Sequence, residues 1–184
     1  LGKTLGVALD GVADFAQHAF QQHLVVGLHH DTDERLGPGW PHEQPATPEE
    51  MKELFGEGFT DEHEAEARDR WGETDAWKQS AARTSRYTKA DWEQVKAEME
   101  GVNAALIAAK RAGLPPTSVQ AMDAAEAHRR HIADRFYDLD HDSHRRLADM
   151  YVSDPRFTKT YEDLAPGLAA YVHDAIHANA DRHA

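Results

Sequence analysis

The stretch from Val119 to Tyr151 constrains the fold most, because its apolar residues follow the period of an α-helix. They recur at spacings of three, four and seven residues, as on one helix face: Val119, Met122, Ala125, Ile132 and Phe136. The same stretch carries a polar set of Asp123, Glu126, His128 and His131 and, after a short break, His141 and His144. We therefore predict a central pair of helices whose polar residues do chemistry, bind a ligand or form a solvated surface.

Start and stop signals divide the chain from Thr47 onward into further helices. Thr47-Pro48-Glu49-Glu50 fits a capping box that opens a helix ending near Phe55. Gly113 followed by Pro115 ends another helix. Further helix starts are predicted at Thr60, Thr74, Thr88, Ser118, about Ser143, Pro155 and near Pro166. No alternating run is long enough for a strand, so the predicted class is all-α.

The apolar stripes of these helices predict the core. The helix from Thr88 has its stripe at Trp92, Val95, Met99, Val102 and Leu106, and the last helix should bury Leu168, Tyr171, Val172, Ala175 and Ile176 before fraying from Asn179. The three short, charged helices between residues 47 and 87 have few apolar residues. We expect them to be the least stable part of the fold.

Residues 1–46 differ from the rest of the chain. A glycine-weakened amphipathic helix is expected from about Thr4 to Leu28, followed by a linker rich in Pro and Gly. We therefore predict an N-terminal segment over residues 1–46 and one domain over residues 47–184.

Charge and composition narrow the function. The net charge of −13 disfavours contact with DNA phosphates. The absence of cysteine excludes disulfides, thiolate nucleophiles and cysteine-ligated zinc. No apolar run reaches the length of a membrane span, and Leu1–Ala19 lacks the features of a signal peptide, so a cytoplasmic protein without membrane contact is expected.

The segment Asp138–Asp142 has the acidic spacing that begins an EF-hand loop, with Asp149 at its twelfth position. However, Ser143 occupies the position that needs Gly, and Arg145 the position of an apolar residue. A break between helices, with local capping by Asp, is the favoured interpretation.

Two His-x-x-His pairs, His128 with His131 and His141 with His144, offer an alternative metal site on adjacent helices. Neighbouring arginines compete with a cation, so we favour packing and hydrogen bonding for these histidines. The chain also lacks a glycine-flanked serine nucleophile and a phosphate-binding loop. A non-enzyme without cofactor is predicted, and a metal-dependent helical enzyme or a purely structural interaction domain remain as alternatives.

Five phrases, in order along the chain, carry a family resemblance: RWGETDA from Arg70, YTKADW from Tyr87, AMDAAEAHR from Ala121, MYVSDPRFT from Met150 and PGLAAY from Pro166. With them, the sequence from Thr47 to His183 resembles the antibiotic-recognition domain of the TipA-type, MerR-family transcriptional activators.

The resemblance implies a globin-like helical module without haem. It also implies binding of thiopeptide antibiotics between a stable C-terminal core and a pliable N-terminal part. DNA binding would need a separate helix-turn-helix, which residues 1–46 do not resemble. A stand-alone drug-sequestering resistance protein is the alternative.

Several aromatic and soft side chains near helix ends favour an apolar cleft for a partly aromatic ligand. The predicted ligand-binding residues are Trp71, Trp77, Tyr87, Met122, Glu126, His128, Tyr137 and His144. The family's thiostrepton-binding founder carries cysteines where this chain has Leu139 and Arg146, so the resemblance implies that binding here is non-covalent.

Overall fold

The computed structural model describes residues 44–55, 69 and 72–184. Within this part of the chain the ordered elements are all α-helices: α2 (Pro48–Phe55), α4 (Asp75–Thr84), α5 (Lys89–Arg111), α6 (Val119–Arg135), α7 (His141–Ser153), α8 (Pro155–Leu164) and α9 (Leu168–Arg182). The described residues contain no strand, which confirms the all-α prediction. The predicted helices from Thr4 and Thr60, the linker and Trp71 lie outside the described residues.

Hydroxyl side chains set the starts of the helices as predicted. Thr74, Thr88 and Ser118 precede α4, α5 and α6 in extended conformation, and each accepts a hydrogen bond from a backbone N–H of the first turn. At α5 the capping box is complete, because the Asp91 carboxylate accepts the Thr88 N–H at 2.9 Å.

The start of α7 differs from the prediction. It begins at His141 rather than near Ser143, because the Asp140 carboxylate accepts the Ser143 N–H at 2.7 Å and so acts as the N-cap. The interpretation of Asp138–Asp142 as a helix break with Asp capping is thereby confirmed.

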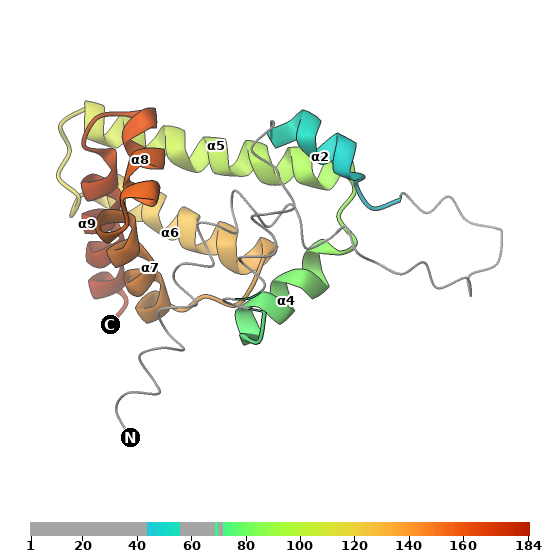
Figure 1. Ribbon diagram of the computed structural model, residues 1–184. Helices are drawn as coiled ribbons and strands as arrows, with labels where there is room; N and C mark the ends of the chain where they lie inside the picture. The colour runs from blue at the N-terminus through green and yellow to red at the C-terminus, as the bar shows by residue number, and fades with distance from the viewer. Residues whose placement is uncertain (1–43, 56–68, 70–71) are drawn as a thin grey trace, which may run out of the picture.

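The C-terminal helices form the core of the molecule. The most extensive contacts join α7 to α9 and α5 to α6, and α6 also packs on α9 (Figure 1). Alanines at these contacts are fully buried and let the helix backbones approach closely: Ala121, Ala125, Ala148 and Ala175. The predicted stripes of α5 and α9 are buried in full, so both predictions are confirmed.

Two predictions about the ends of helices are wrong. Val119 is 61% exposed, because Ala121 and Ala124 take the buried positions near the start of α6, while Ala125, Ile132 and Phe136 of the predicted face are buried as expected. Asn179 does not lie in a frayed end. It is fully buried in α9, where its side-chain amide donates to Glu126 at 2.9 Å.

Helices α2 and α4 are attached to the edge of this core (Figure 1). Met51 is α2's buried residue, and the Lys96 ammonium on α5 donates to the α2 carbonyl of Leu54 at 2.8 Å. Arg83 of α4 donates to the Ala133 carbonyl and to Asp138, both at 2.6 Å. These two helices make fewer contacts with the core than the C-terminal helices make with one another, and the low stability expected of this part of the fold stays a prediction.

None of the helices in the described ranges combines the length and apolar character needed to cross a bilayer.

Candidate functional site

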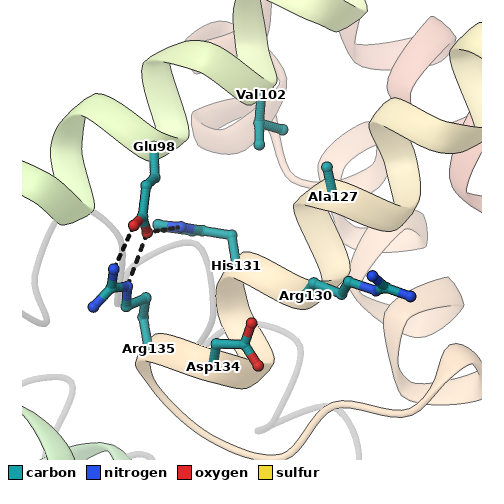
Figure 2. A pocket seen from close by; sticks show the side chains of 7 residues that line it. All are labelled: Glu98, Val102, Ala127, Arg130, His131, Asp134 and Arg135. Atoms are coloured by element: carbon teal, nitrogen blue, oxygen red, sulfur yellow. Dashed lines mark hydrogen bonds and ion pairs between the residues drawn. The ribbon is translucent and has the colours of Figure 1, made fainter.

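A pocket of about 440 Å³ opens between α5 and α6 (Figure 2). Helix α5 contributes Glu98 and Val102, and α6 contributes the rest of the lining: Ala127, Arg130, His131, Asp134 and Arg135. The side chains from α6 lie at spacings of one, three and four residues, so they form one continuous face of that helix.

A charged cluster forms one wall of the pocket. Arg135 makes a two-pronged contact with Glu98, in which its Nε donates at 2.8 Å and its Nη2 donates to the other carboxylate oxygen. His131 Nδ1 lies 3.3 Å from the same carboxylate. This bidentate pairing fixes the guanidinium plane and ties α5 to α6 at the pocket wall.

The charges of this wall are held in defined states. Hydrogen bonds from Arg135 lower the pKa of Glu98 against the opposing effect of its burial. Burial lowers the pKa of His131, and the nearby Glu98 carboxylate opposes that shift. At neutral pH the wall therefore presents a carboxylate and a guanidinium beside a largely uncharged imidazole.

The rest of the lining combines apolar and exposed charged groups. Val102 and Ala127 form the apolar part, while Arg130 and Asp134 stand exposed at the rim. The lining contains no Ser, Thr, Cys or Lys side chain. The pocket thus offers a small apolar surface flanked by five ionisable side chains, so a ligand there could make both apolar contacts and hydrogen bonds.

Tyr87, one of the predicted ligand residues, contacts the backbone of the pocket-lining Arg135. Its hydroxyl donates to the backbone carbonyl of Arg135 at 2.7 Å, and its ring packs edge-on against Trp92. Trp77 is buried in α4, and Met122 is half-buried near the start of α6. The role of these three residues in ligand binding stays a prediction.

Glu126 lies inside the core rather than on the pocket wall. Its carboxylate accepts hydrogen bonds from Arg129 at 2.6 Å and Asn179 at 2.9 Å, and Arg130 and His141 lie 3.1 Å away. Burial alone would raise the pKa of Glu126, but these donors outweigh it and bring the pKa far below its usual range. Glu126 thus joins α6, α7 and α9.

His128 and His144 form a stacked, buried pair with His128 Nδ1 2.9 Å from His144 Nε2. The Tyr161 hydroxyl lies 3.3 Å from the other nitrogen of His128. Burial lowers the pKa of His128 to about 3 and that of His144 well below its usual value, so both rings are neutral. Tyr137 is also buried in the core, and this burial raises its pKa.

The four histidines considered for a metal site do not converge. His128 faces His144, whereas His131 faces Glu98 and His141 faces Glu126. The acidic residues of the would-be EF-hand also diverge: Asp138 pairs with Arg83 and Asp140 caps α7.

The two positions at which the family resemblance implied cysteines have structural contacts here. Leu139 is buried, and its carbonyl accepts a 2.6 Å hydrogen bond from Arg129. Arg146 is half-buried and donates to the Ser143 hydroxyl at 2.8 Å.

The fold and this site are those of an all-helical ligand-binding domain, in which a pocket with charged side chains on its wall lies between two long helices. Residues 63–179 match the TipAS antibiotic-recognition domain. The transcriptional activator TipA of Streptomyces coelicolor is 49% identical over 137 residues, which are 74% of this chain and 54% of TipA. The activator mta of Bacillus subtilis is 32% identical over 128 residues, which are 70% of this chain and 42% of mta.

Among solved structures, TipAS of Streptomyces lividans in complex with nosiheptide is similar, with a TM-score of 0.68 and 48% identity. The match covers 76% of this chain and 98% of that one. The chain belongs to the TipAS antibiotic-recognition domain family. It spans about half the length of the curated TipA relatives it matches.

None of the seven residues that line the pocket was among the predicted ligand residues. His131 was predicted to serve in packing and hydrogen bonding, with a metal site as the alternative. One usable signal was present in the sequence: on α5, Glu98 lies between Val95 and Val102 of the apolar stripe, which brings a carboxylate to the edge of a buried face.

Proposed function

We propose that this domain binds a thiopeptide or similar peptide antibiotic without forming a covalent bond, as the effector-binding part of a MerR-type transcriptional regulator. The observation that carries the proposal is the similarity to TipAS in its nosiheptide complex, which extends over 98% of that chain. The named relatives are transcriptional activators, and a binding role without catalysis agrees with the composition of the pocket.

The α5–α6 pocket is the proposed anchoring point for the ligand. Its volume of about 440 Å³ accommodates part of a bulky peptide antibiotic, and the remainder would extend past the exposed rim. Glu98, Arg135 and His131 offer hydrogen bonds to amide and heterocycle edges of the ligand, while Val102 and Ala127 contact its apolar face. Without a cysteine in the chain, thiol addition is not open to this protein.

The aromatic residues predicted for the cleft complete the proposal. Tyr87 lies one hydrogen bond away from the pocket wall at Arg135, and it precedes the capping box that begins α5. A shift of α4 toward this wall on ligand binding would add Trp77 to the contacts that Tyr87 makes there.

The test is calorimetric titration of the domain with nosiheptide and with other peptide antibiotics. Ala127→Trp places an indole in the pocket at an exposed position, so affinity should fall at least about tenfold while the fold is retained. The control is Ala104→Trp, an equal increase in bulk on an exposed face of α5 outside the pocket lining.

Equal affinities of the two variants would refute the pocket assignment. Absence of binding by the unmodified domain to every antibiotic tested would refute the proposed function itself. Binding by the domain alone, without any effect on transcription in the full-length parent, would identify a drug-sequestering protein instead.

A further inference from the structure

A three-residue cluster on the outer face of α7 and α9 has the geometry of a metal site. His173 and His177 are one helical turn apart on α9, and Asp149 faces both from α7. Asp149 Oδ1 lies 3.1 Å from His173 Nε2 and 2.8 Å from His177 Nε2. The three potential ligand atoms all lie within 4.8 Å of one another.

We propose that Asp149, His173 and His177 bind a divalent transition-metal ion of the zinc class. Zinc bonds of about 2.0–2.1 Å at tetrahedral angles place neighbouring ligand atoms roughly 3.3 Å apart. The two distances to Asp149 already lie within a few tenths of an ångström of that separation. Two imidazoles and one carboxylate are ligands that suit zinc. Calcium and magnesium prefer sites made of oxygen ligands alone, so they are not expected here.

An outer hydrogen bond supports the assignment. The second ring nitrogen of His173, Nδ1, lies 2.8 Å from the Asp174 carboxylate. A carboxylate at this position fixes the tautomer that leaves the Nε2 lone pair free for a metal. With Asp149 facing Nε2, His173 then has a carboxylate at each nitrogen, an arrangement that only a proton or a metal ion on Nε2 can satisfy.

The surrounding charge also favours a dication. Asp149 and Asp174 are both exposed carboxylates of the cluster. The two arginines of α7 nearest to Asp149 already have partners: Arg146 donates to the Ser143 hydroxyl, and Arg145 is paired with Asp181. Both histidines are about a quarter to a third exposed, so an ion reaches their nitrogens without opening the core.

A second His-containing cluster, formed by Glu126, His141 and His183, is a poorer site. The Glu126 carboxylate there is already occupied by Arg129 and Asn179, and Arg130 adds a further positive charge. A cation at that position would have to displace a buried ion pair. Substitution of His183, which belongs to this second cluster, therefore serves as a control for the proposed site.

A metal ion in the proposed site would join α7 to α9. Three protein ligands leave a fourth tetrahedral position open to water or to an outside donor. Because the ion binds the folded chain, it would stabilise the C-terminal core by an amount that grows with the logarithm of its free concentration. This inference is independent of the proposed antibiotic binding.

The experiment is calorimetric titration of the full chain with zinc chloride, after purification without a histidine tag and treatment with a chelator. One ion per chain is expected, together with a rise in Tm on addition of zinc. His177→Ala and Asp149→Asn should each weaken binding at least about tenfold, and Asp174→Asn about tenfold through its hold on His173. His183→Ala should leave the affinity unchanged.

Absence of binding below about 1 mM zinc would overturn the proposal, as would a loss of affinity in His183→Ala that equals the loss in His177→Ala. Because these residues are exposed, the variants are expected to fold, and circular dichroism checks that they do.

Discussion

Replacing Glu126 tests whether the charged network inside the core has a structural role. The substitution Glu126→Ala removes the acceptor for Arg129 and Asn179 while leaving both donors in place. The Arg129 side chain is 17% exposed and that of Glu126 is 11% exposed, so the remaining cation is poorly hydrated. Asn179 is fully buried and loses its partner for the amide N–H.

The expected cost is large. Breaking a buried ion pair by removing one partner costs about 3–5 kcal/mol, mainly because an uncompensated charge stays in the interior. In a domain of this size that corresponds to a fall in Tm of roughly 6–20 °C. Glu126→Gln keeps the shape and one acceptor, and it should lose about 2 kcal/mol, as expected for hydrogen bonds to a charged group.

Urea unfolding at pH 7, followed by circular dichroism, measures these changes. Asp163→Ala serves as the control, because it removes an exposed i,i+4 partner of Lys159 and should cost less than about 0.5 kcal/mol. A loss below about 1 kcal/mol for Glu126→Ala, or one equal to that of Asp163→Ala, would refute the reasoning.

The same carboxylate predicts a pH dependence. Because its pKa is lowered in the folded state, the stabilisation from Glu126 is complete above the unfolded value of about 4.3 and is lost as the pH falls below it. Glu126→Gln should therefore be less sensitive than the unmodified protein to acid below pH 4.3.

Three further predictions concern other elements. Burial keeps His128 and His144 neutral in the folded state, so the free energy of unfolding should fall below about pH 6.5 by up to roughly 1.4 kcal/mol per pH unit for each ring. Urea midpoints measured between pH 7 and 5 should show this fall. The double variant His128→Phe/His144→Phe should flatten the pH dependence. Arg83→Ala should release α4, with hydrogen exchange of its amides accelerated while α9 stays protected; equal acceleration in both helices would contradict it. Thr88→Ala should cost about 1 kcal/mol by removing the capping box of α5, with no change in the urea m-value.

The sequence predicted the helices and most of the core, because both depend on local period and capping chemistry. The five-residue stripe of α5 and that of α9 are buried as expected. The errors came where a helix face is decided by its neighbours. On α6 the predicted residues Ala125, Ile132 and Phe136 are buried, but near its start Ala121 and Ala124 face the other helices and Val119 is left in solvent.

The pocket could not be predicted because it depends on what the helices leave uncovered. Glu98 and Arg135 meet across 37 positions of sequence, and each alone resembles an ordinary surface charge. The histidines show the same limit in another form. Their spacing at 128, 131, 141 and 144 suggested a metal site, yet helix packing pairs His128 with His144 and directs His131 to Glu98 and His141 to Glu126. The same packing brings His173, His177 and Asp149 together across α7 and α9. Sequence spacing determines which residues share a helix face, whereas the crossing of two helices determines which faces become a site.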